Sequence, residues 1–442
     1  MPEESLEALR RVIRGGLCTR CGACAGLSGG RIAFRDREGA HLPDVLEPVP
    51  DEVAERARRA CSGAEVPLGE LSAFAFGEGA ARHPYLGAFR RLAVGCAADP
   101  EVRRAGSSGG ILTAVLLHLL ERGEIAGAVV TAMDPEKPWL PRTAIATSAE
   151  EIRAAAQSKY VITAANEILP EMERFSGPLA YVGLPCQVHA IRKLERAGDP
   201  SVRRVRCVFG PFCGNTLHIS SIESFLRSHG VRDLREITRL EFRAGEWPGS
   251  LRIALRSGRV LELPKFHANY LIPFHIVKRC LLCVDLANEL ADLSGGDAWA
   301  PVYEERGKGF SLIAARSQEA EALLARMEAA GLLELAPISP EDAARMHSHG
   351  YDLKKRGAPI RIAFRRIVRK PVPDYGTSFG RFPVSRWALE AAISFLFAAF
   401  GTRPARWLLR RARPRLLGAL FVRFRTLWKR ATRGVKTKDL AG

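Results

Sequence analysis

The chain has little that would take it into or across a membrane. No positively charged, apolar leader opens it, and the apolar stretch 387–400 is shorter than the roughly 20 residues that a spanning helix needs. No internal repeat of solenoid length occurs. We therefore expect a cytoplasmic protein, in which structural disulfides are rare. Ten cysteines in that compartment are better explained as metal ligands than as bridges.

Acidic residues are scarce at the C-terminal end. The net charge of the chain is +18, and residues 401–442 contribute +12 because they hold thirteen Arg and Lys and one acid, Asp439. Such a segment favours an acidic partner. Its apolar residues can share one helical face, as in an in-plane membrane helix: Leu416, Leu417, Leu420, Phe424, Leu427 and Trp428. We expect this tail to contact an anionic membrane, which would make the protein peripheral on the inner face.

The apolar pattern predicts an α+β fold: a mixed α/β core with an antiparallel portion, a small N-terminal head and a helical basic C-terminal tail. Strand-like runs at 92–97 and 128–131 flank a glycine loop and an amphipathic helix, which together form a β-loop-α-β unit. Another strand, tight turn and helix follow at 178–194. Antiparallel strands are expected at 239–243 and 251–263, and helical patterns return over 311–347.

The first cysteine set lies near the N-terminus. Cys18, Cys21 and Cys24 form a C-x-x-C-x-x-C run, which forces three thiolates into a small volume. The bacterial ferredoxin run continues to a fourth cysteine, but here that position is Ser28, so Cys61 is the expected fourth ligand. A zinc site or buried free thiols are the alternatives, although zinc sites more often use paired C-x-x-C units or histidine. Four thiolates can hold one [4Fe–4S] cluster.

The second cysteine set is spread over about a hundred residues. It combines two cysteines at glycine- or proline-containing turns after apolar runs with one C-x-x-C pair: Cys186, Cys213, Cys280 and Cys283. By spacing alone this set is less specific than the first. The remaining two lie inside apolar strand-like runs and are expected to be core thiols: Cys96 and Cys207.

A loop of small residues, Ser107, Ser108, Gly109 and Gly110, lies between a predicted strand and a predicted helix. Small residues there let backbone N–H groups approach a phosphate at the helix N-terminus. The loop is neither G-x-G-x-x-G nor a P-loop, so a simple turn remains an alternative. Two clusters need a redox partner, and a flavin would convert one-electron to two-electron chemistry.

Several segments together resemble one family, the beta subunits of coenzyme F420-dependent hydrogenases and dehydrogenases, which includes the 7-hydroxymethyl chlorophyll a reductases. They occur in the family's order over about residues 15–310: CTRCGAC (18–24), SSGGILTAVLLHLLERG (107–123), SKY (158–160), YVGLPCQVHAIRKL (181–194), FCGN (212–215) and RCLLCVDLANELADLSGGDAW (280–299). The resemblance implies an iron–sulfur flavoprotein oxidoreductase with two [4Fe–4S] clusters and FAD. Such a protein passes electrons between a ferredoxin-like or subunit donor and a two-electron carrier or organic acceptor.

The resemblance also assigns residues. It implies a flavin-side cluster on the second cysteine set and an outer cluster on the first. Contacts to FAD are implied for Ser107, Ser108, Gly109, Gly110, Thr113, Ser158, Lys159, Tyr160, Gln187 and Asp297. Lys159 is expected as a counter-charge for a phosphate or the reduced flavin, and His189 as a proton donor. A structural or FAD-orienting role is expected for the acids after the last cysteine pair: Asp285, Glu289, Asp292 and Asp297.

With these assignments the chain divides into four parts. They are an iron–sulfur head (1–82), an FAD-binding N-terminal family domain (83–165), a C-terminal family domain with the flavin-side cluster (166–347), and a linker with the basic amphipathic tail (348–442). A relay subunit without a substrate of its own is the main alternative. A zinc-bound nucleic-acid protein that stacks bases on Trp407, Phe421, Phe424 and Trp428 is a third. The cysteine spacing and the glycine loop argue against it.

Overall fold

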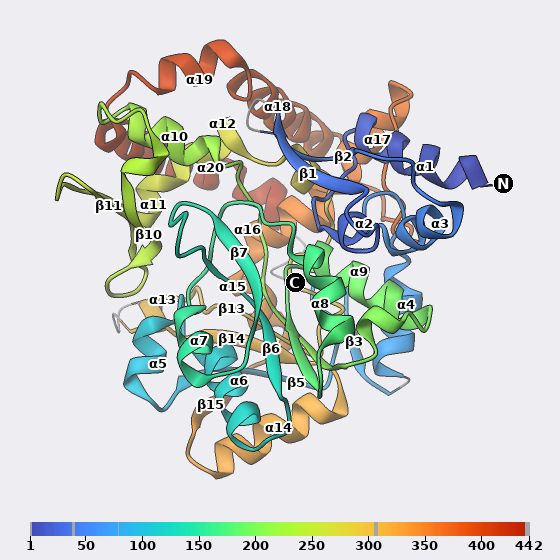
Figure 1. Ribbon diagram of the computed structural model, residues 1–442. Helices are drawn as coiled ribbons and strands as arrows, with labels where there is room; N and C mark the ends of the chain where they lie inside the picture. The colour runs from blue at the N-terminus through green and yellow to red at the C-terminus, as the bar shows by residue number, and fades with distance from the viewer. Residues whose placement is uncertain (1, 38–39, 78, 305–307, 438–442) are drawn as a thin grey trace.

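The computed structural model describes residues 2–37, 40–77, 79–304 and 308–437. At its centre is an eight-stranded mixed sheet of order β15-β5-β14-β13-β9-β8-β6-β7 (Figure 1). In that order the strands are Leu333–Pro337, Arg91–Ala97, Ser311–Ala315, Leu293–Asp297, Val205–Pro211, Leu179–Val182, Gly127–Met133 and Pro141–Ala146. The four strands β13, β9, β8 and β6 run parallel, and the other neighbours pair antiparallel. The predicted mixed α/β core is confirmed.

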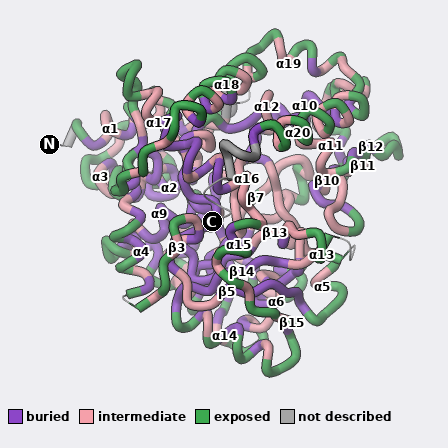
Figure 2. Tube along the Cα trace, turned by 180° about the vertical axis from the view of Figure 1, so that it is seen from behind, coloured by how far each residue is buried: buried purple, intermediate pink, exposed green. Residues whose placement is uncertain are grey.

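Successive residues of the sheet strands enter two different cores, as the two-residue period of a strand requires. Ala93 and Ile313 face the core shared with α6 (Ile111–Glu121) and α14 (Gln318–Ala329). Their neighbours Leu92 and Leu312 face the opposite core, beneath α15 (Pro340–Met346). Both faces of the sheet are therefore covered, and Figure 2 shows its inner strands β5 and β14 largely in the colour of buried residues.

A second lobe holds the expected antiparallel strands β10 (Ile237–Ala244), β11 (Ser250–Leu255) and β12 (Val260–Pro264). The C-terminal helices fold back onto this lobe: α18 (Val384–Phe400), α19 (Arg403–Leu409) and α20 (Pro414–Thr437). Leu409, Leu417 and Phe421 pack in the core of the lobe. Figure 1 shows α18 and α19 across the top of the molecule and α20 below them. Residues 438–442, the end of the predicted tail, lie outside the described residues.

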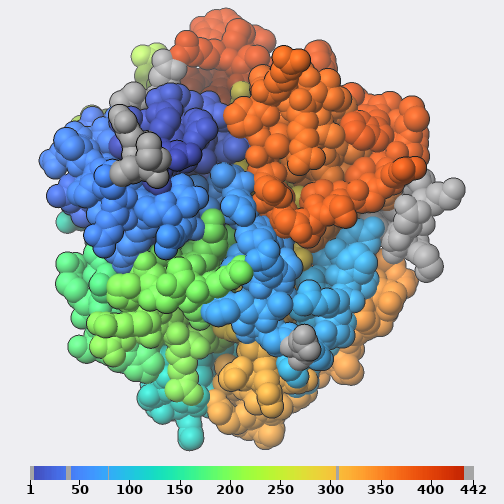
Figure 3. Space-filling view, turned by 90° about the vertical axis from the view of Figure 1, so that its right-hand side faces the viewer, coloured from blue at the N-terminus to red at the C-terminus, as the bar shows by residue number. Residues whose placement is uncertain are grey.

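The N-terminal head packs against residues from the far end of the chain. Its elements are α1 (Pro2–Arg14), α2 (Ala23–Gly26), β1 (Ile32–Arg37), β2 (Ala40–Val45), α3 (Asp51–Ala60) and α4 (Leu68–Phe76). The amide of Val66 donates to the carbonyl of Asp374 at 2.8 Å, and the amide of Asp374 donates to that of Ala64 at 2.6 Å. Figure 3 shows the blue head beside the orange C-terminal segment on one face.

Three parts of the chain differ from the sequence-based expectation. Residues 311–347 contain the strands β14 and β15 besides helices, because a short apolar run fits a buried strand as well as a helix. Residues 348–367, expected within a linker, form α16 (Ser348–Tyr351), a π-helical turn (Asp352–Gly357) and α17 (Ala358–Ile367), and bury Tyr351 and Ile360. In the predicted β-loop-α-β unit, β5 and β6 are separated by four other strands of the sheet.

A buried ion network joins α18 to the π-helical turn. Arg386 donates to Asp352 at 3.1 and 3.2 Å and to Glu390 at 2.7 Å. Arg361 of α17 donates to the other oxygen of Glu390 at 2.7 Å. All four side chains are buried. The network therefore makes the first half of α18 a core element and anchors the C-terminal helices.

Glu390→Ala should lower the free energy of unfolding by about 3–5 kcal/mol, because it leaves Arg361 and Arg386 buried with less opposing charge. Glu262→Ala is the matched control, since it removes the partner of the exposed Arg252 at 3.0 Å and should cost at most about 1 kcal/mol. Urea denaturation followed by circular dichroism gives both values. Equal losses in the two variants would contradict a structural role of the buried network.

Candidate functional site

A cavity of about 510 Å³ lies between the large sheet and the second lobe. The sheet side is formed by residues at the carboxyl ends of the four parallel strands, among them Thr131, Val182, Pro211 and Asp297. Residues of the second lobe, such as Lys265, close the opposite side. Crevices outside the carboxyl ends of parallel strands are where open α/β sheets bind ligands. The cavity is therefore the first candidate for a cofactor site.

The structure brings the predicted cofactor residues together at this cavity, with one exception. Those that line it are Ser107, Ser108, Gly110, Thr113, Ser158, Lys159, Tyr160, Gln187 and Asp297. Gly109 is not part of the lining. Its amide donates to the Ser311 hydroxyl at 2.9 Å, and a Cβ atom there would lie 2.4 Å from the carbonyl oxygen of Gly95. Gly109 therefore serves the close approach of the loop to strand β5.

The glycine loop places the N-terminus of α6 at the cavity. Gly110 is the N-cap residue, with φ of 75°, and no side chain caps the first turn. The loop is held from outside by two side-chain bonds: the Ser158 amide donates to the Ser107 hydroxyl at 2.7 Å, and the Ser108 and Ser311 hydroxyls lie 2.7 Å apart. Uncapped N–H groups at a helix N-terminus form a site suited to an anion.

Lys159 adds a fixed cation to the cavity wall. Its ammonium group donates to three carbonyl oxygens at the end of α7 (Ala149–Ala154): Ala155 at 2.6 Å, Ala156 at 2.7 Å and Gln157 at 3.0 Å. The C-terminal end of a helix favours a positive charge, although burial lowers the pKa of Lys159 to about 7. The protonation of Lys159 therefore depends on what occupies the cavity.

Asp297, at the end of β13, is held by cations and an indole from the second lobe. It accepts from Arg243 at 2.8 Å and from the Trp247 indole at 2.7 Å, and the Lys265 ammonium lies 3.8 Å away. Burial opposes its ionisation, but Lys265 and Arg243 hold the pKa of Asp297 below its usual value. Arg243 also donates to the Tyr160 hydroxyl at 3.0 Å. Neither Arg243 nor Lys265 lies in a recognisable sequence motif. They could not be predicted as site residues, because only the fold brings the second lobe against the glycine loop.

His347 lines the cavity and was not singled out by the sequence. Its Nε2 atom donates to the carbonyl oxygen of Asp297 at 2.7 Å. Burial lowers the pKa of His347 to about 4, so its ring is neutral at pH 7 and Nδ1 is left as an acceptor. The residue lies beyond the motifs of the resemblance, and no nearby pattern marked it as a site residue.

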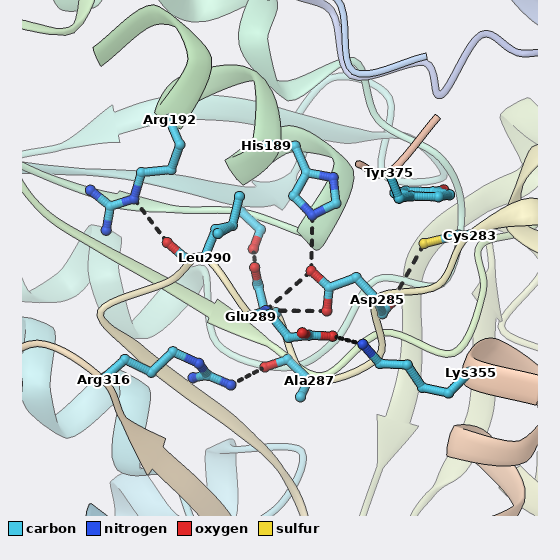
Figure 4. A network of polar contacts seen from close by, with 12 residues as sticks. His189, Arg192, Cys283, Asp285, Ala287, Glu289, Leu290, Arg316, Lys355 and Tyr375 are labelled. Atoms are coloured by element: carbon cyan, nitrogen blue, oxygen red, sulfur yellow. Dashed lines mark hydrogen bonds and ion pairs between the residues drawn. The ribbon is translucent and has the colours of Figure 1, made fainter. Parts of the chain in front are cut away.

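His189, the predicted proton donor, is not part of the cavity lining. Its Nε2 atom lies 2.9 Å from a carboxylate oxygen of Asp285, and both side chains are buried (Figure 4). Asp285 also accepts from the amide of Glu289 at 3.1 Å, and Glu289 pairs with Lys355. These contacts are structural. The position of His189 gives no support to a role in proton transfer at the cavity.

The first cysteine set is gathered in one place. Burial raises the pKa of Cys24, and the charges of Cys18, Cys21 and Cys61 raise it further. Burial likewise raises the pKa of Cys18 to about 12, and Cys61 and Cys21 act in the same direction. Lys193 donates to the carbonyl oxygen of Cys61 at 2.7 Å. The four thiols of this set therefore lie close enough to interact with one another, next to a cation.

The second set is gathered in the same way. Burial raises the pKa of Cys186, and the charges of Cys213, Cys280 and Cys283 add to that rise. Lys354, from the π-helical turn, is buried here and donates to the carbonyl oxygen of Cys280 at 3.4 Å. Burial favours its neutral form, but the charges of Cys283, Cys213 and Cys280 raise the pKa of Lys354 above its usual value. The turn that carries this cation lies outside every motif of the resemblance.

The two sets adjoin each other, and the second adjoins the cavity. Arg20 interacts with the charges of Cys18, Cys186 and Cys280, and Cys213 lines the cavity. Arg20 has φ of 63°, and its buried Nε atom has no hydrogen-bond partner. All ten cysteines are free thiols. Among the described residues, however, no three His, Cys, Asp or Glu side chains have the arrangement of a metal site.

Comparison with known proteins confirms the resemblance. The N-terminal part of the coenzyme F420 hydrogenase/dehydrogenase beta subunit family matches residues 92–170, and its C-terminal part matches residues 177–341. The coenzyme F420 hydrogenase beta subunit of Methanosarcina barkeri is 28% identical over 264 residues, which cover 58% of this chain and 84% of that protein. The corresponding subunit of Methanothermobacter thermautotrophicus is 26% identical over 294 residues, which cover 65% of this chain and 99% of that protein.

A solved structure has a similar fold. It is a chain of the F420-reducing [NiFe] hydrogenase complex of Methanosarcina barkeri, with a TM-score of 0.53 and 23% identity. The match covers 66% of this chain and 99% of that chain. The π-helical turn that carries Lys354 and helix α18, which carries Arg386, lie beyond the residues that the family matches.

His347 should remain uncharged down to about pH 4. Because the unfolded chain protonates histidine near pH 6.5, it binds more protons than the folded chain between these values, and His347 therefore lowers stability as pH falls through this window. Imidazole-labelled NMR titration, with His347→Gln to identify the resonance, measures the midpoint. A midpoint near 6.5 would show that the ring is not buried against Asp297.

Proposed function

This chain belongs to the coenzyme F420 hydrogenase/dehydrogenase beta subunit family, and on that premise we propose that it is an iron–sulfur flavoprotein oxidoreductase. The observation that carries the proposal is the position of Cys213, which belongs to the second thiol set and also lines the cavity. The first thiol set thus adjoins the second, and the second adjoins a ligand-sized cavity. Such an order suits electron transfer between a one-electron donor and a two-electron acceptor.

The thiol sets fit two [4Fe–4S] clusters in number and chemistry. Each set supplies four free cysteines, and thiolates are the ligands of such clusters. Arg20, Lys193 and Lys354 would offset the negative charge of the bound thiolates, because each lies against one or both sets. The unpaired Nε atom of Arg20 supplies a donor for an acceptor that a cluster would bring.

The cavity fits FAD. Its volume of about 510 Å³ is in the range of cofactor sites, and its glycine loop presents an uncapped helix N-terminus. We infer that this N-terminus and Lys159 would hold the diphosphate. FAD would supply the exchange of two electrons and a proton with the acceptor.

We propose that His347, which lines the cavity, takes part in the transfer of that proton. The backbone carbonyl oxygen of Asp297 accepts a hydrogen bond from Nε2–H of His347, which leaves Nδ1 as an acceptor. Asp297 in turn is fixed by Arg243 and Trp247. We propose that Nδ1 of His347 accepts this proton; His189, the proton donor predicted from the sequence, does not line the cavity.

A second candidate function is that of an electron-relay subunit. It is favoured by one finding: the curated relatives reported above are named as subunits of a hydrogenase. A relay would accept electrons from dithionite-reduced ferredoxin and pass them to dyes, yet form no organic product without a partner subunit. Turnover of the chain alone, with coenzyme F420 and other two-electron acceptors, distinguishes the two functions.

Anaerobically purified protein should contain about eight irons per chain, together with FAD. Cys186→Ser should reduce the iron to about four and prevent reduction of the flavin by reduced ferredoxin. Cys207→Ser is the matched control, since Cys207 packs in the hydrophobic core with α6, and should leave both unchanged. Zinc without flavin in the wild-type protein, or unchanged iron in Cys186→Ser, would refute the proposal.

The affinity for FAD should fall as pH rises above 7. The ligand-free pKa of Lys159 is about 7, and a bound diphosphate would raise it, so binding above pH 7 takes up a proton. Affinity should decline by up to about tenfold per pH unit until the bound pKa is reached. Calorimetric titration of flavin-free protein between pH 6 and 9 measures this.

Lys159→Met should bind FAD more weakly at pH 6 and lose most of this slope. Lys370→Met removes an exposed lysine of the same size and should keep the slope. An identical pH profile in Lys159→Met and wild-type protein would contradict the contact of Lys159 with the diphosphate.

A further inference from the structure

We propose that helix α20 docks the protein on an anionic membrane surface through its exposed apolar and arginine-rich face. This inference goes beyond the proposed redox function and does not depend on any cofactor. It rests on what α20 exposes, on what it packs against, and on the charge of the surrounding chain.

One face of α20 presents large apolar side chains to solvent. They recur at three- and four-residue intervals and are between 51% and 65% exposed: Leu416, Leu420, Phe424 and Leu427. Single exposed apolar residues are common on protein surfaces, but a row along one helix face is not. The exposed Arg423 and Arg430 flank the row. Apolar residues beside arginines along one helix are the composition of an in-plane membrane helix.

The opposite face of α20 fixes the helix to the protein. Leu417 and Phe421 pack in the core of the second lobe, and Gly418 lies against His267 of α11 (Lys265–Ala268). The Arg425 guanidinium lies 5.6 Å from the centre of the Phe266 ring. The sequence-based expectation placed Leu417 on the same face as Leu416, but the structure turns Leu417 inward. Because the inner face of α20 is packed against the second lobe, the exposed apolar residues on its outer face cannot turn into the core.

Charge complementarity selects the kind of membrane. No Asp or Glu occurs between Glu390 and Asp439, so the apolar row lies in a segment with basic residues alone. The exposed Trp407 of α19 lies under the Arg411 guanidinium, 3.4 Å from the ring centre, which matches the side chains found at membrane interfaces. An anionic lipid surface therefore fits this segment better than a neutral one.

Attachment in the plane of the membrane fits better than crossing it. No single described helix is long and apolar enough to span a bilayer; only α18 and α19 together pass by length and composition, and they are bent by 71°. Arg386 and Glu390 of α18 are buried in the protein's own ion network. The exposed apolar row of α20 is therefore the surface that we expect to contact the lipid.

Flotation of the purified full-length protein with vesicles tests the proposal. Wild-type protein should float with vesicles of phosphatidylglycerol and phosphatidylcholine in equal parts, and much less with phosphatidylcholine alone. Raising the salt from about 0.1 M to about 0.5 M should weaken binding. Extraction with sodium carbonate should release the protein; retention would mean insertion across the bilayer and would overturn in-plane docking.

Two pairs of variants separate the apolar from the electrostatic contribution. Leu420→Ser with Phe424→Ser should weaken partitioning at least about tenfold. Val260→Ser with Val302→Ser is the matched control, since these valines are 56% and 53% exposed on other elements, and should bind as wild type. Arg423→Gln with Arg430→Gln should weaken binding about fivefold per arginine, whereas Arg203→Gln with Arg204→Gln, equal in charge, should not.

The other occupants of this face give distinct results. If the wild type fails to float and Leu420→Ser with Phe424→Ser instead abolishes a dimer in sedimentation, the face binds a second copy of this chain. If the wild type is retained by DNA and only the arginine variants lose that retention, the segment binds nucleic acid. Either result overturns the proposal. Circular dichroism and a cooperative urea transition show that each variant is folded.

Discussion

The guanidinium of Arg279 is the contact on which the arrangement of the thiol sets depends. It donates to the carbonyl oxygens of Leu17 and Gly63 at 3.0 and 3.2 Å and to the Tyr375 hydroxyl at 3.0 Å. One buried cation, next to the C-x-x-C pair, thereby joins the head, the second family domain and the C-terminal segment. Its loss would remove the donor from the carbonyl oxygens of Leu17 and Gly63, which lie close in sequence to Cys18 and Cys61.

Buried charge is the recurring constraint around the site. Cysteine thiols and carboxylates lie inside the protein next to cations from other parts of the chain, such as Lys354 for the second thiol set and Arg243 for Asp297. Burial raises the pKa of the Cys18, Cys24 and Cys186 thiols, whereas the close cations Lys265 and Arg243 hold the pKa of Asp297 below its usual value. The protonation of cavity residues such as Asp297 is thus set by neighbours that are distant in sequence and that the fold brings close.

Local pattern was sufficient to predict the strands β5, β6 and β8, the helix α6, the antiparallel lobe and the lining residues of the glycine loop. Each depends on residues close in sequence, where periodicity and turn composition carry the signal. Arg243 and His347 could not be predicted in this way. Arg243 reaches the cavity from the second lobe, and His347 lies after residue 341, where the family match ends. Gly109 and His189, which the sequence predicts as site residues, do not line the cavity. Gly109 is hydrogen-bonded to Ser311, and His189 to Asp285.

The chain cannot be divided into independent parts at the family boundary. The buried ion network of Arg386, Asp352, Glu390 and Arg361 holds the segment after that boundary together. The family matches end at residue 341, yet the cation of the second thiol set and the Tyr375 partner of Arg279 come after it. A chain cut at the family boundary would lose Lys354, His347 and Tyr375 together and would expose Arg279. The C-terminal extension is therefore not an appendage, because its residues complete the surroundings of Arg279, of the second thiol set and of the cavity.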